Sequence, residues 1–190
     1  MLIHEMTEEE CADVLEQARV GRLACARDNQ PYVVPIFFVY HGGHVCGRHL
    51  SGKHLYGFTT LGQKIEWMRA NPLVCVETDE VTSFDRWMSV VVLGRYEELP
   101  DTPEFEAARV TAYELLQRHA VWWQPGYVST VHRDPAQPLI PIYYRIRIER
   151  VTGHRATPEE DETPASAAPV RETKGRGLLH GLLRPARDRR

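Results

Sequence analysis

Long runs of β-branched and aromatic residues most strongly constrain how this chain of 190 residues can fold. The runs Tyr32–Tyr40, Trp87–Glu97 and Ile140–Val151 have the composition of strands. Val20–Ala26 reads as a further strand, joined to the first run by the turn residues Asp28–Pro31, which predicts a hairpin. Because Tyr32–Tyr40 is apolar at nearly every position, we expect it to be buried on both faces, as in a small barrel.

Two residues within these runs predict local irregularities. Pro35 cannot donate a backbone hydrogen bond, so the strand should be bulged or lie at an edge there. Gly94 indicates a bulge or a tight bend in the longest run.

Helices are predicted between the strands. Thr7–Glu10 is a capping box that begins one helix, and Thr102 followed by Pro103 has the pattern of another helix start. A third helix is predicted over Leu61–Ala70. The predicted fold class is therefore mainly β with peripheral helices, a closed antiparallel β-barrel within the α+β class.

Composition limits the function and the domain count. The hydrophobic share of 43% and the charged share of 26% are typical of a soluble globular protein, and the net charge of -3 offers no basic surface for nucleic acid. No apolar run has the length of a membrane span, and Met1–Met6 does not resemble a signal peptide, so we expect no membrane partner and a cytoplasmic location. Residues 1–154 read as one domain, whereas the composition of 155–190 predicts a disordered tail.

Cysteine and histidine spacing predicts neither disulfides nor a metal site. The four cysteines, Cys11, Cys25, Cys46 and Cys75, show no paired spacing. The segment His44–His54 carries further nitrogen and sulfur ligands, but their spacing matches no metal motif.

The segment Leu55–Pro72 reads as a strand that runs through a glycine-containing turn into an amphipathic helix. Free N–H groups and the positive end of the dipole make such a helix start an anion site. Thr59 and Thr60 add hydroxyl donors, and Lys64 adds a cation that would repel the dipole unless an anion were present. The pattern predicts a bound phosphate, although an ordinary surface turn has a similar local sequence.

Four segments together resemble one known family: Tyr32–Phe37, Leu55–Pro72, Trp87–Glu97 and Tyr144–His154. They look like the pyridoxamine 5′-phosphate oxidase-like FMN-binding split-barrel superfamily, and within it the branch related to nitroimidazole-resistance flavoproteins. The resemblance covers roughly 1–154. It implies an FMN-binding split barrel and a homodimer with the flavin in a groove between the subunits.

The resemblance also implies cofactor-binding residues. The family's phosphate-binding segment falls on Thr59, Thr60, Gln63 and Lys64. The strand whose backbone lies against the flavin ring falls on Val34, Pro35 and Ile36, although Val34 and Ile36 fit equally well as core residues. A strand start that reaches the flavin from the partner subunit falls on Trp87 and Ser89, and Trp122 and Trp123 are candidates for the wall of the substrate site.

The expected function is that of an FMN-dependent oxidoreductase, either a flavin reductase or a nitroreductase-like enzyme, acting on a small molecule. The sequence shows no catalytic triad or paired carboxylates, so no catalytic residue is assigned. Thr152–Arg155 matches only part of the arginine-rich signature of true pyridoxamine phosphate oxidases, which argues against vitamin B6 oxidation. Two alternatives stay open: a non-catalytic flavin-binding or storage protein, and a relative that binds haem or another cofactor through His44–His54.

Overall fold

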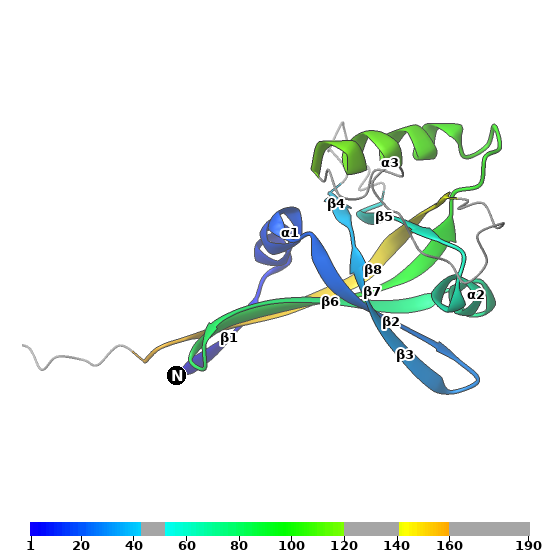
Figure 1. Ribbon diagram of the computed structural model, residues 1–190. Coiled ribbons are helices and arrows are strands. Elements are labelled where there is room, and N and C mark those ends of the chain that lie inside the picture. The colour runs from blue at the N-terminus through cyan, green and yellow to red at the C-terminus, as the bar shows by residue number, and fades with distance from the viewer. Residues whose placement is uncertain (43–51, 120–140, 160–190) are drawn as a thin grey trace, which may run out of the picture. The chain divides into compact units, whose positions relative to one another are not determined.

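The computed structural model describes residues 1–42, 52–119 and 141–159 (Figure 1). The chain divides into two units, Met1–Glu159 and Glu160–Arg190, and every described residue belongs to the first. Strand β8 continues to Thr157, so the residues 155–157 belong to the sheet rather than to the predicted tail.

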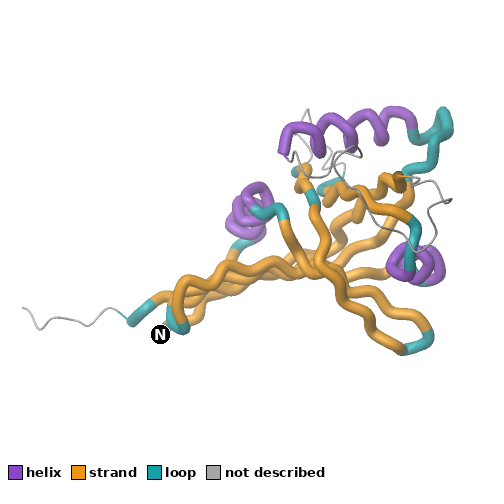
Figure 2. Tube along the Cα trace, in the orientation of Figure 1, coloured by secondary structure: helices purple, strands orange, loops and turns teal. Residues whose placement is uncertain are grey.

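One antiparallel sheet and three helices make up the described part of the chain (Figure 2). The strands are β1 (Leu2–Met6), β2 (Val20–Arg27), β3 (Gln30–Phe37), β4 (Val39–His41), β5 (His54–Thr60), β6 (Leu73–Ser83), β7 (Arg86–Glu98) and β8 (Pro141–Thr157). The helices are α1 (Glu8–Gln17), α2 (Gln63–Ala70) and α3 (Glu106–His119). The predicted class, mainly β with peripheral helices, is confirmed.

The strand order shows how the sheet curls. The order is β3-β2-β6-β7-β8-β5-β4, and β1 pairs with β8 beside this path. The two outermost strands, β3 and β4, are consecutive in the chain and separated only by the buried residue Phe38. The sheet must therefore bend until the ends of its two edge strands meet, which is the arrangement of a split barrel.

Strand β3 differs from its prediction. A single strand over Tyr32–Tyr40, buried on both faces, is wrong, because β3 lies at an edge and leaves Val33 59% and Phe37 41% exposed. The edge position of Pro35 is confirmed, and its pairing with Arg22 continues without a bulge. Proline lacks an N–H group, so only the edge of a sheet accepts it without losing a ladder hydrogen bond.

Local sequence signals fix several other boundaries. Asp28 and Asn29 have left-handed φ values of 51° and 63°, as the tight turn of a β2–β3 hairpin requires. The Thr7 capping box is present in full at the start of α1. The pairing of β7 with β8 shifts register at Leu93/Gly94, which confirms the predicted bulge. The helix predicted from Thr102 begins later, at Glu106.

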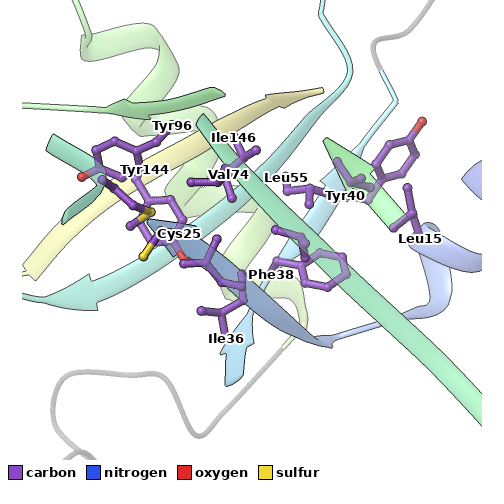
Figure 3. Packing of buried hydrophobic residues seen from close by; sticks show 14 of the residues in the cluster. Leu15, Cys25, Ile36, Phe38, Tyr40, Leu55, Val74, Tyr96, Tyr144 and Ile146 are labelled. Atoms are coloured by element: carbon purple, nitrogen blue, oxygen red, sulfur yellow. The ribbon is translucent and has the colours of Figure 1, made fainter. Parts of the chain in front are cut away.

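The main core lies between the curled sheet and two helices (Figure 3). Leu15 of α1 and Ile65 and Met68 of α2 are at most 2% exposed. Helix α3 covers other residues, with Ala112 and Leu116 packed in smaller clusters that include Tyr56 and Val39 respectively. Within the described ranges, no helix is both long and apolar enough to cross a membrane.

Candidate functional site

The junction between β5 and α2 leaves backbone donors without a partner among the described residues. Strand β5 ends at Thr60, and Gly62 is the N-cap of α2 without any side-chain cap. The N–H groups of Ile65 and Glu66 donate to the Gly62 carbonyl, at 2.9 and 3.2 Å. The N–H groups of Gln63 and Lys64, the first two residues of α2, therefore have no acceptor within the helix and lie at the positive end of its dipole.

Space is available in front of these donors. Gly62 has an extended backbone, with φ 174°, and a Cβ atom added to it would meet no heavy atom of the described residues within 4 Å. The glycine is therefore not needed for its conformational freedom. It leaves the helix start open to an approaching group.

Lys64 is the unusual residue of this junction. Its side chain is half-buried and has no hydrogen bond or ion pair with any residue of the described ranges, and burial lowers its pKa. A partly desolvated cation beside the positive end of a helix is unfavourable by itself. A bound anion would compensate both costs, so the position of Lys64 favours an anion site over an ordinary surface turn.

Thr59 and Thr60 end β5 on opposite faces of the strand. Thr59 lies opposite Ile142 and Thr60 opposite Pro141, and the Thr59 hydroxyl donates to the Thr60 carbonyl at 3.4 Å. The side chains of neighbouring strand residues point to opposite faces of the sheet. One ligand can therefore contact both hydroxyls only if it lies at the end of the strand. That place is in front of α2.

The β3 residues lie close to α2. The rings of Tyr32 on β3 and Trp67 on α2 are 5.4 Å apart, and Lys64 precedes Trp67 by about one helical turn. Val34 is half-buried against the main core and Ile36 is 4% exposed within it, so both side chains serve the core. Pro35 faces outward. One chain thus brings together the β3 residues and the β5–α2 residues.

Trp87 and Ser89 lie at the other end of the sheet. Trp87 pairs with Ala156 of β8, whereas Thr60 pairs with Pro141 of the same strand. Those β8 positions are about 15 residues apart, or roughly 50 Å along the strand. A single chain therefore does not bring Trp87 and Ser89 to the β5–α2 junction.

The outer face of the sheet carries a row of apolar residues. Val33, Ala24, Cys75 and Leu93 lie opposite one another across four strands in one row. Val33 and Leu93 are 59% and 44% exposed. The register puts Pro35, Ser89 and Trp87 on this same face, together with the ion pairs of Arg22 with Glu77 and Asp79. Exposed apolar residues beside such polar groups are typical of an interaction surface.

Tertiary contacts that sequence reasoning missed hold α2 at its C-terminal end. Arg69 donates from Nε and Nη2 to the two carboxylate oxygens of Glu98, both at 2.8 Å. The Tyr96 hydroxyl donates to Glu98 at 3.1 Å, and Asn71 Nδ2 donates to the Ala26 carbonyl at 3.0 Å. No spacing in the sequence signals these partners, because they come from different strands.

Some predicted residues lie outside the described ranges, namely Trp122, Trp123 and most of His44–His54. His54 itself is 9% exposed, and its pKa is lowered by burial and by Arg145. Across the described ranges, no group of three or more histidine, cysteine, aspartate or glutamate residues is arranged to hold a metal ion.

Comparison with known proteins gives consistent matches. The family model described as pyridoxamine 5′-phosphate oxidase matches residues 7–155. An uncharacterized protein of Rhizobium meliloti is 38% identical over 156 residues, which cover 82% of this chain and 97% of that protein. A crystal structure described as an FAD-binding protein of Mesorhizobium loti is 42% identical, with a TM-score of 0.63, and the match covers 83% of this chain and 99% of that one.

A more distant structure shows the same fold. It is described as a 5-nitroimidazole antibiotic resistance protein of Bacteroides thetaiotaomicron and shares 18% identity, with a TM-score of 0.54. The match covers 82% of this chain and 89% of that one. Identity at this level supports the fold alone.

Proposed function

Because this chain belongs to the pyridoxamine 5′-phosphate oxidase family, we propose that it binds a flavin at the β5–α2 junction and acts as an oxidoreductase on a small molecule. The observation that carries the proposal is the half-buried Lys64, which has no anionic partner within the described ranges. A relative 42% identical to this chain is described as FAD-binding, which supports a flavin as the ligand.

The residues at the junction fit the phosphate of a flavin. Lys64 would supply the charge, while the Thr59 and Thr60 hydroxyls and the free N–H groups of Gln63 and Lys64 would donate hydrogen bonds. Strand β3 would lie beside the rest of the cofactor, with Pro35 on its outer side. The bound flavin supplies the redox chemistry, and the chain contributes binding, orientation and access to the ring.

FMN is our prediction for the flavin, and FAD is the second candidate. Both carry a phosphate next to the ribityl chain, so the β5–α2 junction fits either one. The description of the Mesorhizobium loti relative favours FAD. Mass spectrometry of the flavin released from purified protein distinguishes them, since FAD carries an additional adenylate group.

We also propose that the protein is a homodimer with the flavin between its subunits. The exposed apolar residues Val33 and Leu93 on the outer face support this, because a second copy would remove them from water. The distance between Trp87 and the β5–α2 junction within one chain is a second argument. In a dimer, Trp87 and Ser89 of one subunit would approach the cofactor of the other.

The proposed reaction passes a hydride or electrons from the reduced flavin to a small acceptor, as in a flavin reductase or a nitroreductase-like enzyme. A non-catalytic flavin-binding protein is the alternative, supported by relatives whose descriptions name binding and no reaction. Reduced nicotinamide with a nitroaromatic acceptor separates the two. Turnover of the nitroaromatic acceptor would support the enzyme. A bound flavin that reduced nicotinamide never reduces would support a non-catalytic binding protein.

The flavin assignment is tested by absorbance and titration. Purified protein should show a flavin band or gain one with FMN, and Lys64→Ala should weaken FMN binding while riboflavin, which lacks the phosphate, binds as before. Lys53→Ala is a matched control, because Lys53 pairs with Glu8 at 3.4 Å on a different surface. A protein that binds no flavin, or one that shows a haem Soret band instead, would refute the assignment.

A further inference from the structure

Helix α2 is tied to the end of β7 by an ion pair that contacts no part of the proposed site. We propose that the Arg69–Glu98 pair, supported by Tyr96, is a positioning device that sets the phosphate affinity of the β5–α2 junction by fixing the orientation of α2. This inference rests on the proposed function, and its experiment separates the failure of one from the failure of the other.

The pair has directional geometry. Arg69 Nε and Nη2 reach separate oxygens of Glu98, each at 2.8 Å, so the guanidinium and carboxylate meet in a two-pronged contact. The hydrogen bond from Arg69 lowers the pKa of Glu98. Such a contact specifies an orientation as well as a distance, which a single-point lysine contact does not.

Tyr96 holds the carboxylate in place. Its side chain is 6% exposed, its hydroxyl donates to Glu98 at 3.1 Å, and its ring lies 5.7 Å from the fully buried ring of Tyr144. Its backbone N–H donates to the Pro72 carbonyl at 2.8 Å, immediately after α2. The Glu98 carboxylate is therefore held by the buried Tyr96 side chain as well as by Arg69.

The pair lies close to the proposed phosphate site along the sheet. Glu98 pairs with Tyr144 of β8, which in turn pairs with Gly57 of β5, three residues before Thr60. The Arg69–Glu98 pair and the phosphate donors thus lie at the same end of the barrel.

A substitution of Arg69 should therefore change the position of Lys64. The two residues are five positions apart, or about 7.5 Å along the helix axis. Between them Ile65 and Met68 bury α2 in the core, so the helix can tilt about these contacts when its C-terminal anchor is loosened. A tilt would move the free N–H groups and Lys64 relative to Thr59 and Thr60, and sub-ångström placement matters in such sites.

The same contact contributes little to overall stability. The side chains of Arg69 and Glu98 are 48% and 28% exposed, and ion pairs in such partly solvated positions are weak. The Asn71 contact with Ala26 and the buried residues of α2 would keep the helix folded without the pair. Loss of the pair should consequently change ligand affinity more than the melting temperature.

The test compares FMN with riboflavin in the full-length protein. Arg69→Lys keeps the charge but loses the two-pronged contact, and Glu98→Gln removes the carboxylate. Each should raise the Kd for FMN roughly tenfold and leave the Kd for riboflavin unchanged, since only FMN uses the phosphate donors. Arg95→Lys is the matched control, because Arg95 makes a comparable half-exposed ion pair with Glu149 at 3.5 Å.

A double variant adds a second readout. When Lys64→Ala has already removed the lysine charge from the phosphate site, adding Arg69→Lys should weaken FMN binding by a smaller factor than it does in the wild-type protein, because both changes act on one site. Equal losses for FMN and riboflavin, or unchanged FMN affinity in both single variants, would overturn the positioning role. A wild-type protein that binds no flavin would instead refute the proposed function.

Discussion

Tyr32 of β3 and Trp67 of α2 lie with ring centroids 5.4 Å apart and ring planes tilted by 54°. The pair joins the edge strand, which carries Val34–Ile36, to the helix that begins at the proposed phosphate site. Both rings also pack against the main core. The contact thereby holds β3 and α2 side by side, although they belong to different parts of the sequence.

The first prediction concerns the interaction energy between the Tyr32 and Trp67 rings. Tyr32→Leu and Trp67→Leu should each lower the free energy of unfolding, and the double variant should lose less than their sum. The expected coupling is about 0.5–1.5 kcal/mol, as for other tilted aromatic pairs. Urea unfolding of the four proteins gives the value, and strictly additive losses would show that the rings do not interact.

The second prediction concerns Gly57 in β5. A Cβ atom there would collide with the ring and hydroxyl of Tyr144, which is 1% exposed and has no room to move. Gly57→Ala should therefore lower the free energy of unfolding by about 1–3 kcal/mol. Gly62→Ala is the control with open space around it, and a similar loss in both variants would contradict the steric explanation.

The third prediction is a loss of stability on mild acidification. Burial and the Arg145 guanidinium lower the pKa of His54 below its usual 6.5, while Glu97 opposes this and His41 adds to it. His54 therefore binds a proton more readily in the unfolded chain than in the folded protein. The free energy of unfolding should consequently fall as the pH drops below about 6.5.

His54→Gln should flatten that part of the pH profile, as measured by denaturant titrations between pH 7 and pH 5. The exposed His4→Gln serves as the control for replacing a histidine elsewhere in the chain. An identical slope in wild type and His54→Gln would assign the acid sensitivity to other groups.

The fourth prediction is an alkaline limit to cofactor binding. Burial lowers the pKa of Lys64 from the usual 10.5, so the free protein loses this charge at a lower pH than an exposed lysine would. The affinity for FMN, expressed relative to riboflavin, should fall as the pH rises through the lowered pKa. Lys64→Arg keeps its charge and should show a flat ratio, whereas a flat ratio in wild type would place the phosphate elsewhere.

The fifth prediction tests the outer face of the sheet. Val33→Asp puts a charge on the face proposed to meet a second subunit and should convert a dimer into a monomer, as measured by light scattering after size-exclusion chromatography. Val110→Asp is the matched control, since Val110 is 50% exposed on α3, away from this face. A wild-type monomer would refute the dimer, and dissociation by both variants would mean that the effect is not specific to the face.

Local sequence determined much of this protein. The Thr7 capping box, the Asp28-Asn29 turn, the bulge at Gly94 and the strand-to-helix junction before Lys64 could all be predicted, because each depends on residues within a few positions of one another. The family resemblance also identified the fold class, since several such segments occur in a characteristic order.

Only the tertiary structure decided which distant segments meet. Strand β1 has no clear signal of its own and forms by pairing with β8, where Ile3 lies opposite Ala156. The exposure of Val33 and the partner of Arg69 likewise depend on the order of strands in the sheet. A residue's own side chain sets its local conformation, but its burial and its long-range hydrogen bonds are set by the segments packed around it, which local sequence patterns do not identify.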